Sequence, residues 1–306
     1  MATDTPVAPT TSTTEPGGAP APGRGPGRLR GATRFARSHP FAVVATVVLV
    51  LYVVMALVGS TWSDAAYDQD PALRLQGPSS GNLLGTDDLG RDLFARIAIG
   101  ARTSLAVGAL VTVLAVALGI VTGLATGYSK AVDATLSRLI DGVLAFPAFL
   151  FAIAMVSVLG AGVRAEVIAL ALAFWPRISR VVRSSTLQLK EAPFIEAARA
   201  GGSRSGTILF RHILPNAVSP IIVRGTFVFA ESILLDAGLS YLGLGAVPPT
   251  PSWGNMLSDA QVYLTLDPWF VFVPGIAIVG AVLALNVVGD ALRDWLDPHS
   301  RAGGRA

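Results

Sequence analysis

The residues that could carry out catalysis in this chain are few and widely separated. The chain contains no cysteine, which excludes a thiolate nucleophile and a thiolate metal site. Its three histidines do not form the HExxH spacing of a zinc enzyme, and they are His39, His212 and His299. Residues 238–242 have a central serine but lack the second glycine of a nucleophile elbow. We therefore expect no catalytic residue, no metal site and no intrinsic enzymatic activity.

The sequence also lacks a loop of the Walker type that would bind the phosphates of ATP. Such a loop needs Gly-Lys followed by Ser or Thr, because backbone N–H groups and the lysine hold the phosphates together. The chain has two lysines, Lys130 and Lys190, and neither follows a glycine. We expect no cofactor on this chain, so any use of ATP would require a separate protein.

Two charged residues, Arg224 and Glu231, stand inside the otherwise apolar segment 217–235. Residues with this spacing share one face of a helix and lie about 10 Å apart along its axis. That separation predicts no direct pair, so each charge needs another partner or water. Because a lone charge at the centre of a bilayer costs about 3 kcal/mol or more, we expect this face to turn toward neighbouring helices or a polar path, not toward lipid.

Long apolar blocks must position these residues. Apolar residues make up 52% of the chain and charged residues 14%, whereas soluble domains carry about 25% charged residues. Six blocks are long enough to cross a hydrocarbon layer of roughly 30 Å as helices. They lie at about 41–59, 105–128, 139–159, 163–182, 217–235 and 268–289. The sequence thus predicts an all-α membrane protein with six transmembrane helices, in which Gly119 and Gly123 mark a close helix contact.

The distribution of charge predicts the orientation of these helices. Basic residues gather in the cytoplasmic loops of membrane proteins, which accounts for the formal net charge of +3 without a nucleic-acid partner. Segment 177–211 and the N-terminal tail are rich in arginine, whereas segment 237–267 has no basic residue. Both basic segments should therefore be cytoplasmic, which requires the weakest block, 163–182, to span the membrane.

These expectations divide the chain into three parts. Residues 1–37 are rich in Pro, Gly, Thr and Ala, and they predict a disordered, basic cytoplasmic tail. Residues 38–297 form the six-helix transmembrane domain, and residues 298–306 a short cytoplasmic tail. Both termini are expected in the cytoplasm.

The segment between the fourth and fifth blocks predicts a short helix of small residues. Pro193 suits the first turn of a helix, and the helix dipole favours the carboxylate of Glu196 there. Gly201 and Gly202 end the helix, because glycine tolerates the left-handed conformation of a C-terminal cap. Such a helix, with alanines at 197 and 198, is narrow enough to enter a groove on a partner.

Three motifs resemble those of ABC-importer permeases of the dipeptide, oligopeptide and nickel class, and in particular the second of the two permeases in such systems. They occupy residues 82–93, 194–216 and 239–257, and the resemblance covers about residues 35–297. The two outer motifs contain Gly85, Thr86, Asp87, Gly90, Arg91, Asp92, Pro249, Trp253 and Gly254. The middle motif, which in this family couples the permease to an ATPase, contains Glu196, Ala197, Ala198, Gly202, Leu214 and Pro215. His212 fits the peptide subclass, whereas Gly201 replaces a larger aliphatic residue.

The resemblance implies a fold like that of type I ABC importers, with a cytoplasmic coupling helix, in a bacterial inner membrane. It implies as partners a second permease, two ABC ATPase subunits that bind ATP and Mg²⁺, and an external solute-binding protein. Di- or oligopeptides are the expected solute, and a nickel complex or another small solute is the alternative. Arg224 and Glu231 belong to none of the three motifs. If their face lines the translocation path, they could hold the carboxylate and amine ends of a peptide, and the alternative is that both charges only pair with neighbouring helices. An ion-coupled secondary transporter is the alternative class, and these two charges are its only support.

Overall fold

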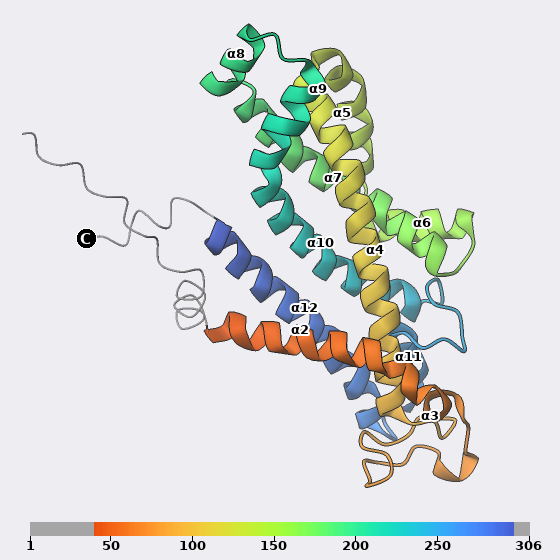
Figure 1. The fold of residues 1–306 in the computed structure, drawn as a ribbon. Helices are drawn as coiled ribbons and strands as arrows, with labels where there is room; N and C mark the ends of the chain where they lie inside the picture. Colours follow the sequence, from red (N-terminus) through yellow and green to blue (C-terminus); the bar gives the residue numbers. More distant parts are fainter. Residues whose placement is uncertain (1–39, 297–306) are drawn as a thin grey trace, which may run out of the picture. The chain divides into compact units, whose positions relative to one another are not determined.

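The computed structural model describes residues 40–296, so the predicted tails lie outside the described residues. The described chain is helical and has no strand, apart from one isolated bridge between Thr86 and Asp92 (Figure 1). The long helices are α2 (Pro40–Val58), α4 (Leu93–Tyr128), α7 (Val163–Leu189), α10 (Leu214–Tyr241) and α12 (Pro268–Leu296). The shorter elements are η1 (Gly59–Trp62), α3 (Ser63–Tyr67), η2 (Pro71–Leu73), α5 (Lys130–Leu144), α6 (Ala148–Leu159), α8 (Pro193–Ala200), α9 (Ser205–Thr207), η3 (Ile208–Ile213), α11 (Trp253–Ala260) and η4 (Gln261–Tyr263).

Four helical runs in the described residues are long and apolar enough to cross a membrane. They are α2, α4, the continuous run Ser205–Tyr241 and α12, with hydropathies from 1.6 to 3.0. They correspond to the first, second, fifth and sixth predicted blocks. Helix α4 begins at Leu93, well before residue 105, because the Asp92 side chain caps it by accepting a hydrogen bond from Ala95 N–H at 2.7 Å.

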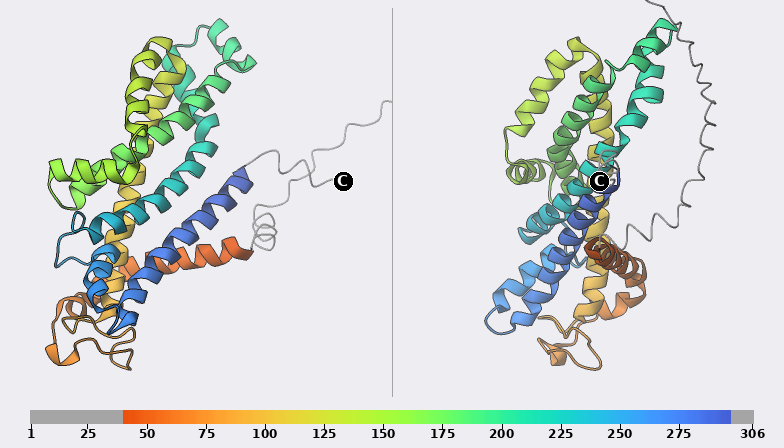
Figure 2. Two further views of the ribbon diagram at one scale, coloured as in Figure 1. Left: turned by 180° about the vertical axis from the view of Figure 1, so that it is seen from behind. Right: turned by 90° about the vertical axis from the view of Figure 1, so that its left-hand side faces the viewer.

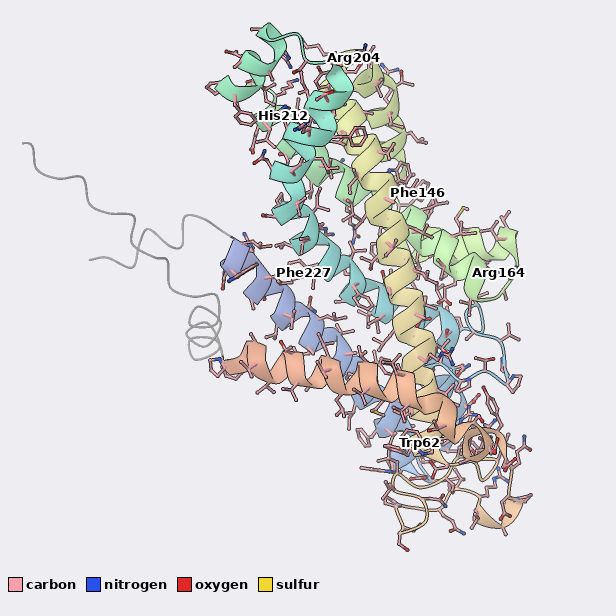
Figure 3. All side chains as sticks on the ribbon, in the orientation of Figure 1. Trp62, Phe146, Arg164, Arg204, His212 and Phe227 are labelled. Atoms are coloured by element: carbon pink, nitrogen blue, oxygen red, sulfur yellow. The ribbon has the colours of Figure 1, made fainter. Side chains whose placement is uncertain are left out.

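The predicted span 139–159 is not one straight helix. It is formed by α5 and α6, which meet at 95° and together are apolar enough for a fifth crossing. The bend falls at Phe146 and Pro147, and Figure 3 labels Phe146 at this junction. Proline has no N–H to continue the helix, and it disfavours helical geometry in the residue before it.

Helix α7 covers the predicted fourth span but is not among the runs apolar enough to be counted as a crossing. Its 27 residues give it sufficient length, and its second half carries Arg177, Arg180 and Arg183. The total of six crossings therefore stays a prediction that rests on the distribution of charge.

Helices α4 and α7 pack closely along a row of glycines. A Cβ on Gly119 would lie 2.4 Å from Ile178 Cγ2, and one on Gly123 would lie 2.6 Å from the Ser179 carbonyl oxygen. A Cβ on Gly127 would lie 2.5 Å from Thr186 Cβ. The predicted helix contact at Gly119 and Gly123 is thus a contact within the chain, between α4 and α7.

A second core joins α10, α11 and α12 to the first part of α4 and to α2 (Figure 2). Its largest fully buried side chain is that of Trp253, whose Nε1 donates a hydrogen bond to the Ile97 carbonyl at 3.2 Å. The Tyr52 ring of α2 meets the Trp253 ring edge-on, with centroids 5.3 Å apart. This packing fixes the loop before α12 against the beginning of α4.

Candidate functional site

The short helix predicted between the fourth and fifth blocks is present as α8, and it has the predicted bounds. It ends in a Schellman motif: Ser203 N–H donates to the Ala198 carbonyl at 3.0 Å, and Gly202 N–H donates to the Arg199 carbonyl at 2.9 Å. Gly202 adopts the required left-handed conformation with a φ of 75°, whereas Gly201 has an ordinary φ of −75°. Of the two glycines predicted to end the helix, Gly202 alone therefore needs to be glycine for its backbone geometry.

Helix α8 presents most of its surface outward. Ile195 is its one fully buried side chain, and Phe194 is 45% exposed. Glu196 and Ala197 are exposed and Ala198 is half-buried. An exposed phenylalanine beside small residues forms an apolar surface that has no partner in the described chain.

The end of α4 holds α8 in place. The Arg199 guanidinium lies 5.9 Å from the centre of the Tyr128 ring, in cation–π geometry. The Tyr128 hydroxyl also donates to Ser205 Oγ at 3.1 Å. The chain then continues through η3, a π-helical turn that contains His212, into Leu214 and the exposed Pro215 at the start of α10 (Figure 3). Leu214 and Pro215 of the middle motif thus lie inside the continuous helical run Ser205–Tyr241, and no break precedes α10.

The first motif, residues 82–93, folds around the buried carboxylate of Asp87. Asp87 accepts hydrogen bonds from the backbone N–H groups of Leu89 and Arg91, each at 2.9 Å, and from Arg91 Nε at 2.6 Å. Arg96 Nε lies 3.3 Å from the same carboxylate. Asp87 thus compensates two buried guanidinium groups.

Arg96 extends this charge cluster to α11. Its Nη2 lies 3.8 Å from the Asp259 carboxylate. Burial raises the pKa of the Asp259 carboxyl above its usual value, and the charge of Arg96 opposes that rise. The cluster therefore links the beginning of α4 to the loop before α12.

The glycines of the first motif allow close backbone contact. Gly90 has a φ of 78°, and a Cβ there would lie 1.9 Å from the Asp70 carbonyl oxygen. Gly85 accepts a hydrogen bond from Leu93 N–H at 3.0 Å. The Thr86 hydroxyl is buried and donates to the Leu73 carbonyl. The motif therefore forms a closely packed cap at the beginning of α4 together with residues 70–73.

The third motif, residues 239–257, is anchored by α11. Ser252 and Asn255 form a capping box at the start of this helix, and Trp253 fills the core described above. Gly254 is buried because α10 approaches it closely, and a Cβ there would lie 2.4 Å from the Ala237 carbonyl oxygen. Pro249 is exposed and follows a cis peptide bond from Pro248. The motifs 82–93 and 239–257 thus meet at one end of α4, and α8 lies near the other end (Figure 1).

The prediction that Arg224 and Glu231 are too far apart to pair is wrong. Arg224 Nη2 lies 3.6 Å from Glu231 Oε1, because a long arginine side chain can cross the two helical turns between the two Cα atoms. Glu231 also accepts a hydrogen bond from Arg177 of α7. We call these three residues the charge triad.

The structure contains a pair of buried acids that the sequence did not predict. Glu166 of α7 and Asp236 of α10 lie against each other and are both 0% exposed. None of their four carboxylate oxygens has a hydrogen-bond partner in the part of the chain that the structure describes. The available signals were Glu166 inside the block 163–182 and Asp236 one residue beyond the block 217–235, and nothing in the sequence indicated that the two are adjacent.

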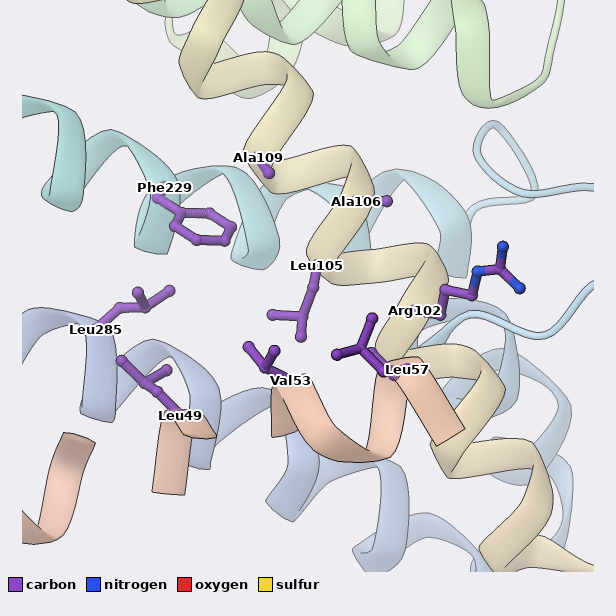
Figure 4. A pocket seen from close by; sticks show the side chains of 10 residues that line it. Leu49, Val53, Leu57, Arg102, Leu105, Ala106, Ala109, Phe229 and Leu285 are labelled. Carbon is purple, nitrogen blue, oxygen red and sulfur yellow. The ribbon is translucent and has the colours of Figure 1, made fainter. Parts of the chain in front are cut away.

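A cavity with a volume of about 470 Å³ lies elsewhere in the described chain (Figure 4). Helices α2, α4, α10 and α12 line it with side chains that are almost all apolar, such as Leu49, Leu105 and Phe229. Arg102 at its edge is the only charged residue of the lining. The cavity contains none of the predicted site residues.

A helical membrane chain with a buried charged cap and an exposed short helix fits a transport subunit that works with partner proteins. Comparison with known families agrees: residues 115–302 match the model of the binding-protein-dependent transport system inner membrane component. The chain belongs to this family and is an inner-membrane permease component of the ABC-importer class.

Curated relatives place the chain more narrowly. The probable peptide ABC transporter permease protein y4tQ of Sinorhizobium fredii is 43% identical over 88% of this chain and 92% of its own length. The dipeptide transport system permease protein DppC of Alkalihalophilus pseudofirmus is 41% identical over 87% of this chain and 88% of its own. The glutathione transport system permease protein GsiD of Escherichia coli is 44% identical over 87% of this chain and 88% of its own length.

A solved structure shares the fold. The MetNI methionine ABC transporter, in an inward-facing conformation, matches with a TM-score of 0.55 and 18% identity. The match covers 66% of this chain and 96% of that chain. This supports the expected type I importer-like architecture and carries no information about the solute.

Proposed function

We propose that this chain is one of two permease subunits of an ATP-driven importer that moves di- or oligopeptides across the bacterial inner membrane. The named relatives support this solute class, since they are described as transporters of peptides, dipeptides and glutathione, itself a tripeptide. A nickel complex or another small solute is the alternative that remains from the sequence. The partners would be a second permease, two ABC ATPase subunits that bind ATP and Mg²⁺, and an external binding protein.

The observation that carries the proposal is the outward-facing surface of α8. Its exposed Phe194, Glu196 and Ala197 stand on a helix that Ile195 and the Arg199–Tyr128 contact fix to the bundle. A groove on each ATPase would receive one such helix. Motion of the ATPases would then pass through α8 into α10 and α4.

The proposed orientation places α8 and both termini in the cytoplasm. The external motifs around Asp87 and Trp253 would then face the binding protein, and their rigid packing would provide a fixed docking platform. The basic residues around α8 and the absence of basic residues in 237–267 support this orientation.

Reconstitution of the complete importer tests the proposal. The chain would be assembled in proteoliposomes with the permease, ATPase and binding-protein subunits encoded beside it. Peptide together with binding protein should stimulate ATP hydrolysis and uptake, and a nickel complex tested in parallel should not. Uptake that follows an imposed ion gradient in the absence of ATP would refute the proposal and support the secondary-transporter alternative.

A further inference from the structure

The charge triad lies in the middle of two long helices. Arg224 follows Leu214, the first residue of α10, by ten residues, and Glu231 precedes Tyr241, the last, by ten. Arg177 stands near the centre of α7, and its guanidinium lies 5.3 Å from the centre of the buried Phe174 ring. Arg177 therefore lies near the middle of α7, and Arg224 and Glu231 lie near the middle of the run Ser205–Tyr241, which is long and apolar enough to cross a membrane.

The triad is accessible. The side chains of Arg177, Arg224 and Glu231 are 36%, 27% and 38% exposed, respectively. Contact of these surfaces with lipid would cost several kcal/mol, because hydrocarbon offers no hydrogen-bond partner to a charge. The accessible side of the triad must therefore face water or a polar partner.

The triad carries an excess positive charge. Two guanidinium groups share one carboxylate, and within the described residues neither arginine has a further ion pair. Arg177 is held both by Glu231 and by the face of the Phe174 ring. The 3.6 Å separation between Arg224 and Glu231 is longer than a hydrogen bond, so the N–H donors of Arg224 remain largely unused.

A planar guanidinium with free donors matches a carboxylate in bidentate geometry. Glu231, which accepts a hydrogen bond from Arg177, attracts the Arg224 guanidinium electrostatically. The arrangement favours an anion over a cation, since a cation would meet net positive charge.

We propose that Arg224 binds the C-terminal carboxylate of the peptide during its passage, with Glu231 and Arg177 as positioning residues. This inference rests on the proposed function, because it assumes that the solute is a peptide and that the triad faces its path. It assigns the chain a selectivity of its own, separate from that of the binding protein.

The test compares one peptide as the free acid and as the C-terminal amide in the reconstituted complete importer. The measured quantity is the ratio of kcat/KM for the acid to that for the amide. Dividing the wild-type ratio by the ratio for Arg224→Gln cancels the preference of the binding protein, which is the same in both assays. A charge-assisted hydrogen bond predicts a quotient of about 10 to 100. Arg224→Lys, which keeps the charge but loses the planar fork, should give an intermediate quotient.

Matched controls separate this role from a structural one. Arg102→Gln removes an exposed arginine of α4 that lies outside the triad, and its quotient should be 1. Uptake of the amide shows that each variant is assembled.

Three outcomes would overturn a claim. Equal loss of acid and amide uptake in both Arg224→Gln and Arg224→Lys would overturn the inference and assign Arg224 a structural role. Loss of co-purification with the second permease would have the same meaning. A quotient of 1 with normal peptide uptake would overturn the inference alone, whereas absence of uptake of any peptide by the wild-type importer would overturn the proposed function.

Discussion

Gly202 offers the sharpest test of the coupling helix. At a φ of 75°, a residue with a branched Cβ is strongly disfavoured, whereas a Cβ at this position meets no atom within 4 Å. The effect of Gly202→Val is therefore conformational, not a collision. The left-handed conformation costs about 1–2 kcal/mol for such a residue. If the residue leaves that conformation, the chain loses the two hydrogen bonds that end α8, worth about 1 kcal/mol each.

Either outcome lowers the equilibrium constant for the correctly ended α8 by about 5- to 30-fold. We expect Gly202→Val to reduce peptide-stimulated ATP hydrolysis and uptake by up to this factor, with basal ATP hydrolysis and membrane insertion preserved. The assay is the ratio of stimulated to basal ATP hydrolysis in the reconstituted importer.

Two neighbouring variants serve as controls. Gly202→Asn should retain most activity, because asparagine adopts the left-handed conformation more readily than valine does. Gly201→Ala should behave as wild type, since its φ is −75° and an added Cβ would lie 3.4 Å from the Ala197 carbonyl oxygen, an ordinary contact. Normal coupling in Gly202→Val, or equal loss in Gly201→Ala, would refute the reasoning.

Three further predictions concern topology, the external cap and the buried acids. In this cysteine-free chain, single cysteines at the exposed Ser79 and Thr250 should react with an impermeant thiol reagent added outside intact cells, and a cysteine at Ser203 should not; external labelling at 203 would overturn the six-span orientation. Asp87→Asn should lower the free energy of unfolding of the detergent-purified complex by about 3–5 kcal/mol, because two buried guanidinium groups lose their compensating charge, whereas Asp68→Asn on the exposed loop should leave thermal unfolding unchanged. Glu166→Gln should be tolerated, because two adjacent buried carboxylates cannot both be charged, and a melting temperature lowered as far as by Glu166→Lys would contradict that view.

The sequence predicted most accurately those features that local chemistry determines. Pro193 and Gly202 define the two ends of α8 because each has a backbone preference that does not depend on the rest of the fold. The apolar blocks likewise identified four crossings, since hydrocarbon imposes their length.

Features that depend on the reach of side chains or on contacts between distant segments were not predictable. The axial distance between Arg224 and Glu231 predicted that their side chains would not pair, but the long arginine side chain spans that distance. The adjacency of Glu166 and Asp236 requires knowledge of how α7 packs on α10. The bend at Pro147 could have been anticipated, because a proline was visible inside the block, whereas the angle of 95° depends on tertiary packing.

The glycine row between α4 and α7 has a mechanical consequence. Helix α4 has 36 residues and is about 54 Å long, and it runs from the Asp92 cap at one end to Tyr128, beside α8, at the other. Where Gly119, Gly123 and Gly127 meet α7, backbone lies almost directly on neighbouring atoms, so the two helices cannot slide past each other without a collision. The pair would therefore move as one stiff unit, and a displacement near α8 would be transmitted along α4 toward the cap around Asp87.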